Sequence, residues 1–249
     1  MKLRRLQRTW DRLAERDPFW AVLTDPNKKG GGWNQEEFFR TGLAEVDHLM
    51  PYLDSLGLPR SRQRALDFGC GVGRVTQALG NRFQEVCGVD VSPVMIRLAR
   101  EYNRHGGRCS FVLNEEPRLG AFPDSSFDFI YSSITLQHME PRFAKAYLLE
   151  FLRVLAPGGL LLFSLPCEPR LHNSRRLSRA WFRLYRFLYY RVLARLLHAG
   201  EPVVEMYGIP RDEVVRLLES HAGRVVDAQP VDSQDRDWIS FRYAVTRDA

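Results

Sequence analysis

The sequence predicts an α/β domain in which helices cover both faces of a mostly parallel sheet. Its middle third alternates short apolar runs with amphipathic segments, which is typical of βαβ units. A glycine-rich turn follows the first of these runs, and an acidic residue ends the second. The 249 residues, 45% of them hydrophobic, suffice for one large core, and no repeat or linker divides the chain. We therefore expect a single domain over residues 1–249.

Five apolar runs of strand length follow one another in the middle of the chain, and two alternating runs lie near its end. The predicted strands are 65–68, 85–90, 109–113, 127–132, 160–165, 224–229 and 239–246. The last run could return antiparallel to the others.

Helix signals lie between and before these strands. Ser92 with Pro93 is a good helix start, and Pro141 opens another helix that a proline and two glycines end. The predicted helices are 3–16, 35–50, 94–102, 141–155 and 210–221, with a further helix after the glycine turn and a flexible loop at 28–33.

The positive charge is concentrated in two segments. Net charge is +6 overall, yet residues 1–16 hold six Lys and Arg against two acids, and residues 170–200 hold eight Arg and no acid. The second segment predicts a basic amphipathic helix at 174–198, within an insertion at 168–202. Its Arg face could be solvated, could contact an anionic or lipidic acceptor, or could lie on a membrane surface. Nucleic-acid binding is disfavoured, because no recognisable module accompanies the charge.

The turn after the first strand carries the strongest functional signal. Glycines at 69, 71 and 73 remove the Cβ atoms that would keep a ligand away from the backbone. A dinucleotide fingerprint would require a glycine at position 74, where Arg74 stands. Asp90 ends the next strand, where its carboxylate can accept both hydroxyls of a ribose. A tight turn without a ligand, with Asp90 as a helix N-terminal charge, is the alternative.

Residues 66–73, the acid at position 90 and the run 155–159 together resemble the class I S-adenosylmethionine-dependent methyltransferases. The resemblance covers about residues 60–167 and implies a Rossmann-like, seven-stranded sheet whose last strand is antiparallel. It implies S-adenosyl-L-methionine as the cofactor of a core at 60–167. Around this core we expect an N-terminal helical cap at 1–58 and a C-terminal helix with strands at 203–249.

The resemblance also implies which residues bind the cofactor. The methionine moiety of the cofactor would lie against the glycine turn, and the ribose against Asp90. The adenine would lie between the residues that follow Asp90 and those that follow the third strand. The sulfonium would lie beside the residues at the end of the fourth strand. The implied residues are Asp67, Phe68, Gly69, Cys70, Gly71, Gly73, Arg74, Asp90, Val91, Met95, Asn114, Glu115, Ser132 and Ser133.

A methyl acceptor that must lose a proton needs a base. His138 follows the fourth strand at the edge where ligands bind in open α/β sheets, and its ordinary pKa suits a base. His138 could equally serve only to hold the loop in place. Two acids in the last third of the chain, Glu205 and Asp237, are the other candidate bases. Cys167 is expected to be a small buried hydrophobe.

Other classes are disfavoured. Four separated cysteines, without histidines at ligand spacing, predict neither a metal site nor a disulfide framework. No apolar run approaches the roughly 18 residues of a membrane span, and a charged start argues against a signal peptide, so we expect a cytoplasmic location.

The sequence thus predicts an O-methyltransferase acting on a small molecule such as a sugar, lipid-linked or natural-product hydroxyl. A methyltransferase that binds RNA or protein through the basic helix, and a non-catalytic cofactor-binding subunit, remain as alternatives. The sequence gives no oligomeric state.

Overall fold

The computed structural model describes residues 3–169, 204–231 and 238–248. The predicted basic helix at 174–198 and Asp237 lie outside these residues.

The sheet has seven strands in the order β3-β2-β1-β4-β5-β7-β6. Strand β7 runs antiparallel to both of its neighbours, and the other pairs are parallel. The predicted Rossmann-like sheet with an antiparallel last strand is therefore confirmed. The strands are β1 (Arg64–Phe68), β2 (Glu85–Asp90), β3 (Cys109–Leu113), β4 (Phe127–Ser132), β5 (Leu155–Pro169), β6 (Gly223–Val231) and β7 (Trp238–Arg247).

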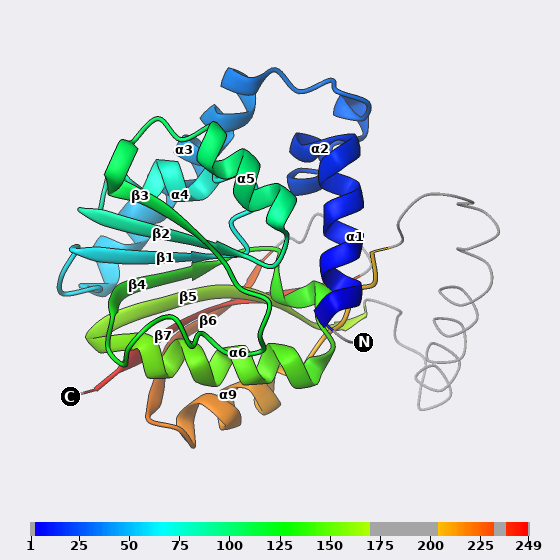
Figure 1. Cartoon of the computed structure of the whole chain (residues 1–249). Coiled ribbons are helices and arrows are strands. Elements are labelled where there is room, and N and C mark those ends of the chain that lie inside the picture. The colour runs from blue at the N-terminus through cyan, green and yellow to red at the C-terminus, as the bar shows by residue number, and fades with distance from the viewer. Residues whose placement is uncertain (1–2, 170–203, 232–237, 249) are drawn as a thin grey trace, which may run out of the picture.

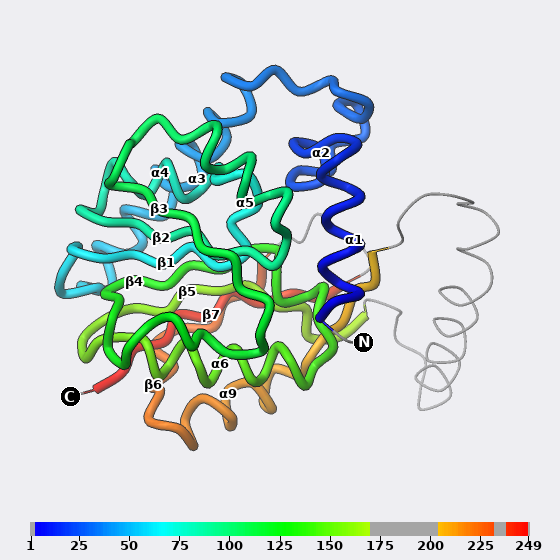
Figure 2. Tube along the Cα trace, in the orientation of Figure 1, coloured from blue at the N-terminus to red at the C-terminus, as the bar shows by residue number. Residues whose placement is uncertain are grey.

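Helices cover both faces of the sheet, and one further helix lies across the ends of its strands (Figure 1). Helices α3 (Gln35–Leu56), α4 (Arg74–Leu79) and α5 (Pro93–Glu101) lie on one face; α6 (Pro141–Val154) and α9 (Arg211–Glu219) lie on the other. Helix α1 (Leu3–Arg16) lies across one end of the strands, and the C-terminus lies at the opposite end (Figure 2).

The helix starts follow local capping chemistry. The Ser92 hydroxyl accepts the Met95 N–H at 3.1 Å, with Pro93 at the first helical position, so α5 begins where predicted. The Asn34 side chain accepts two N–H groups at the start of α3. Asp17 caps α2 (Pro18–Val22), a short helix that the sequence did not predict.

Two elements continue well past their predicted C-terminal ends. Helix α3 continues through Pro51 to Leu56 because Leu53, beyond the proline, is completely buried in the core. Strand β5 extends to Pro169 because β7 pairs with it as far as Trp238. In both cases partners distant in sequence compensate for residues that locally favour an end.

The core consists of one apolar layer on each face of the sheet. The α6 side includes Phe68, Phe151 and Phe163, and the α3 side includes Leu53, Phe129 and Leu162. Because the strands between these layers are rigidly packed, their carboxyl ends are fixed platforms for polar side chains.

Candidate active site

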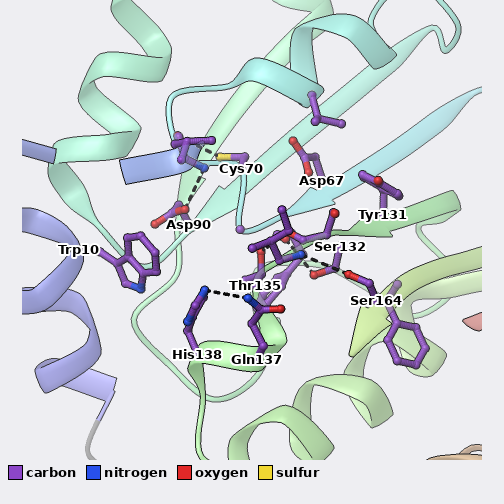
Figure 3. A pocket seen from close by; sticks show the side chains of 18 of the residues that line it. Trp10, Asp67, Cys70, Asp90, Tyr131, Ser132, Thr135, Gln137, His138 and Ser164 are labelled. Carbon is purple, nitrogen blue, oxygen red and sulfur yellow. Dashed lines mark hydrogen bonds between the residues drawn. The ribbon is translucent and has the colours of Figure 1, made fainter. Parts of the chain in front are cut away.

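A cavity of about 1020 Å³ lies over the carboxyl ends of the central strands. The ends of β1, β2 and β4 form its floor, and Trp10 and Leu13 of α1 form part of its wall. Figure 3 shows Trp10 facing Asp90 and His138 from the neighbouring helix. The cavity therefore lies where ligands bind in open α/β sheets.

The glycine turn adopts the left-handed backbone that its residue type permits. Gly69 has φ +80°, and a Cβ there would lie 2.1 Å from Thr135 Oγ1. Gly71 also lines the cavity, whereas Gly73 lies outside its lining and packs against Phe111 at the start of α4. Two of the three predicted glycines thus lie on the cavity surface, and the third sets the direction of the helix.

The Asp90 carboxylate connects the loop that follows β1 with the loop that follows β2. Its Oδ2 accepts the Gly71 N–H and its Oδ1 accepts the Ser92 N–H, both at 2.9 Å. Burial raises the pKa of the carboxyl, against the lowering effect of these backbone donors. Asp90 lines the cavity, where each oxygen has a second lone pair available for a ligand hydroxyl.

A buried polar network lies beneath the turn. Asp67 is 4% exposed and accepts the Thr76 hydroxyl at 2.6 Å, and burial raises its pKa to about 7. Nearby, Glu45 of α3 accepts the Tyr131 hydroxyl at 2.7 Å and pairs with Arg74 at 2.6 Å. Asp67, Arg74, Glu45 and Tyr131 all line the cavity. Glu45 and Tyr131 were not predicted, because a lone Glu on a long helix gives no local sign of its partner.

The predicted adenine residues divide into two groups. Val91, Met95 and Asn114 line the cavity, and the Asn114 amide donates to the Tyr147 hydroxyl at 3.0 Å. Glu115 does not line it; its carboxylate instead accepts the side chain of Gln7 on α1 at 2.7 Å. Glu115 thus holds the N-terminal cap and does not take the cavity position that was the alternative to Asn114.

The loop after β4 is strained beside the cavity. Ser132 is buried and donates to the Phe68 carbonyl at 3.1 Å, and Ser133 follows it in the cavity lining. Ile134 has φ +59°, a conformation costly for a β-branched residue, and its N–H donates to the Ser164 hydroxyl at 3.3 Å. This left-handed conformation turns the chain sharply at the cavity surface.

His138 lies in the wall with a defined tautomer. Its Nδ1 lies 3.3 Å from the Glu205 carbonyl, which can only accept, so Nδ1 carries the hydrogen and Nε2 the lone pair. The Gln137 amide lies 3.3 Å from Nε2, and the Trp10 ring packs edge-on at 5.3 Å (Figure 3). Burial lowers the pKa of His138 to about 4, so the imidazole is neutral at pH 7.

The N-terminal segment covers this cavity. Besides Trp10, Trp20 lines it, and the Asp11 carboxylate of α1 accepts the Ser92 hydroxyl at 2.6 Å. Four other aromatics of the segment pack away from the cavity, in a cluster with Tyr102; they are Phe19, Trp33, Phe38 and Phe39. The segment therefore forms a wall of the cavity and also a small apolar cluster that it shares with α5.

Two other predicted groups lie elsewhere. Glu205 is absent from the cavity lining and accepts the Tyr207 hydroxyl and an Arg5 guanidinium N–H, although its backbone carbonyl orients His138. Cys167 is half-buried and its sulfur accepts the Arg211 N–H at 3.3 Å, so the expectation of a small buried hydrophobe was wrong as to its burial. Within the described part of the chain, no cluster of three potential metal ligands occurs.

Comparison with known proteins agrees with this geometry. A family model described as a methyltransferase domain matches residues 66–163. Demethylmenaquinone methyltransferase of Tropheryma whipplei is 31% identical over 169 residues, covering 63% of this chain and 64% of the relative. Malonyl-[acyl-carrier protein] O-methyltransferase of Halorhodospira halophila is 33% identical over 193 residues, covering 70% and 62%. Residues 66–163 of this chain therefore form a methyltransferase domain of the class I, S-adenosylmethionine-dependent type.

A solved structure extends the likeness to the whole fold. Magnesium protoporphyrin IX methyltransferase from Synechocystis PCC 6803, with bound S-adenosylhomocysteine, aligns with a TM-score of 0.62 at 16% identity, covering 98% of both chains. At this identity the likeness concerns the fold. The chain spans less than two thirds of the length of the two curated relatives.

The cofactor of this methyltransferase family fits the residues present. The turn at Gly69 and Gly71 leaves backbone exposed to the cavity, Asp90 presents a carboxylate, and Met95 and Val91 present apolar surface. A cavity of about 1020 Å³ is at the upper end of the roughly 300–1,000 Å³ of ligand pockets, which leaves room for a second small molecule.

Proposed function

We propose that this domain transfers a methyl group from S-adenosylmethionine to an oxygen atom of a small molecule. The observation that carries the proposal is the single cavity lined both by the glycine turn with Asp90 and by a neutral histidine. When bound, the cofactor supplies a methyl group already activated by a positively charged sulfur. The protein then has to orient the acceptor and exclude water.

Asp90 is proposed to hold the cofactor's ribose, because its oxygens lie at the end of β2 with fixed orientation. The backbone N–H groups of Gly71 and Ser92 fix the carboxylate on one side, so its remaining lone pairs point to a defined place. Asp67 lies on the other side of the turn and presents a second carboxyl to a cationic ligand. Asn114 completes this side of the cavity from the end of β3.

Trp10 and Trp20 are proposed to exclude water from the reacting atoms. Both line the cavity, and α1 is fixed at two points by Asp11 with Ser92 and by Gln7 with Glu115. A low-dielectric wall of this kind strengthens the interactions of the groups it encloses.

His138 is proposed to accept the proton that a hydroxyl acceptor loses. Burial keeps the ring neutral at pH 7, with a pKa of about 4, so Nε2 carries a lone pair. The Gln137 amide faces this lone pair at 3.3 Å, and the acceptor hydroxyl would have to take its place. The Glu205 carbonyl orients the ring by accepting the Nδ1 hydrogen, as carbonyls do for many catalytic imidazoles. An oxygen acceptor accords with this base, and the relative from Halorhodospira halophila is itself named an O-methyltransferase.

Titration of S-adenosylmethionine by calorimetry tests the cofactor site. We expect Asp90→Ala to weaken binding at least tenfold, while Asp212→Ala, which removes a carboxylate 84% exposed on α9, binds as wild type does. Equal binding by all three proteins would contradict the assignment. Transfer of labelled methyl to a panel of hydroxylated small molecules then tests the activity, and tight binding without transfer to any acceptor would indicate a non-catalytic cofactor-binding subunit.

A further inference from the structure

The cavity has a second polar region, away from the glycine turn. It is formed by Ser164 on β5 and by Ser240 and Arg242 on β7, all of which line the cavity. In Figure 3, Ser164 lies on the far side of the cavity from Trp10 and Asp90. We call Ser164, Ser240 and Arg242 the β5–β7 site; the mechanism above does not use them.

The register of the sheet brings these three residues to one face. Ser164 pairs with Arg242, and Ser240 pairs with Pro166 two positions along. Side chains alternate along a strand, so Ser240 and Arg242 share the face of Ala244, which belongs to the core layer packed on α3. The site therefore opens between α3 and the sheet.

Two donors of this site lack a partner among the described residues. Ser240 is 4% exposed and its hydroxyl makes no hydrogen bond there. The buried Nε of Arg242 is likewise unpaired. A buried donor without a partner costs roughly 1–3 kcal/mol, so two of them beside a cavity indicate a ligand that accepts from both.

The positive charge of Arg242 is held in place by neutral groups. Its guanidinium stacks on the Tyr52 ring at 4.3 Å, and its Nη2 lies 3.4 Å from the Gln229 side-chain oxygen. The nearby Asp227 carboxylate accepts the Tyr52 hydroxyl at 2.7 Å. Stacking fixes the plane of the guanidinium and leaves its charge for a ligand.

We propose that the β5–β7 site binds an anionic oxygen group of the methyl acceptor, a carboxylate or a phosphate. This inference rests on the proposed function, because it assigns the anion to the molecule that shares the cavity with the cofactor. A guanidinium matches the paired oxygens of either group, and the Ser240 hydroxyl donates a further hydrogen bond. The substrate class is therefore a small hydroxylated acid or phosphate ester.

Binding of three matched aromatic probes tests the site. Benzoate, phenyl phosphate and the neutral benzamide are titrated, by ligand-observed NMR, into the full chain with and without S-adenosylhomocysteine. We expect at least one anionic probe to bind tenfold to a hundredfold more tightly than benzamide, as charge-assisted hydrogen bonds predict. The better of the two anions identifies the group as carboxylate or phosphate.

Variants then assign the preference to Arg242. Arg242→Gln should abolish it, Arg242→Lys should keep part of it, and Ser240→Ala should reduce it severalfold. Arg224→Gln, on the exposed edge of β6 where it pairs with Asp248, is the matched control and should keep it. A wild type without preference for anions, or a preference that survives Arg242→Gln, overturns the proposal.

The two proposals fail differently. If Arg242→Gln lost affinity for S-adenosylhomocysteine, Arg242 would serve the cofactor, and the assignment to the acceptor would be wrong. If wild type bound the anionic probes but not S-adenosylhomocysteine, the proposed methyltransferase function would fail while the anion site stood.

Discussion

Asp67 makes the stability of this protein depend on pH in an unusual direction. The carboxyl is 4% exposed, and burial raises its pKa from 3.8 to about 7. The folded state therefore keeps the proton up to about pH 7, whereas the unfolded chain releases it near pH 3.8. Because the folded state binds the proton more strongly, this group's contribution to stability falls as the pH rises between these two values.

The magnitude follows from the same two values. At about 1.4 kcal/mol per pH unit, ionised Asp67 lowers the free energy of unfolding by about 4 kcal/mol above pH 7. Asn has nearly the same shape, stays neutral, and can still accept the Thr76 hydroxyl. Asp67→Asn should therefore match wild type near pH 4 and exceed its stability by up to about 4 kcal/mol at pH 8.

Urea unfolding followed by tryptophan fluorescence at pH 4 to 8 measures this difference. Other groups titrate in the same range: the pKa of His138 is lowered by burial to about 4, which weakens the folded state as the pH falls below 6.5. Comparison of variant with wild type cancels these groups, and Asp212→Asn, which replaces an exposed carboxylate, is the matched control. A constant difference between Asp67→Asn and wild type at every pH would refute the reasoning.

Two further substitutions test the geometry of the site. Gly69→Ala and Gly31→Ala place a Cβ at nearly the same φ, +80° and +82°, but only the first would meet Thr135, at 2.1 Å, since nothing lies within 4 Å of the second. We expect Gly31→Ala to cost about 1–2 kcal/mol and Gly69→Ala about 1–3 kcal/mol more in urea unfolding, and equal costs would contradict the close approach. His138→Gln should lower methyl transfer to a hydroxyl by about 10² to 10⁴ with cofactor affinity unchanged. In wild type, titration of His138 should cause no change of rate between pH 5.5 and 8, because burial lowers the pKa of His138 to about 4. Unchanged turnover by His138→Gln would exclude His138 as the base.

The alternation of apolar runs with helix signals was enough to predict this sheet. Strands β2, β3 and β4 begin and end at the predicted residues, because a buried strand is a local run of apolar side chains bounded by turn residues. The glycine turn was equally visible, since only glycine tolerates the positive φ and the close contacts found at position 69. The family resemblance rests on this turn together with Asp90 and the run 155–159.

Elements stabilised by distant partners were predicted less well. Nothing near Pro51 indicates that α3 continues, and nothing near Pro166 indicates that β5 pairs on with β7. The energy that overrides these prolines comes from the burial of Leu53 in the core and from the pairing of Pro166 with Ser240, 74 positions away. Local patterns cannot contain that information.

The sequence by itself determined the fold class, the family and one half of the site, the half carried by the ends of β1, β2 and β4. Only the tertiary structure decided the other half. It decided which residues of the predicted N-terminal cap line the cavity, Trp10 among them, and the strand register places Ser240 and Arg242 beside Ser164, about 75 residues earlier in the chain. The physical reason is that a turn is specified by neighbouring residues, whereas a cavity wall is specified by packing between elements that the chain order leaves far apart.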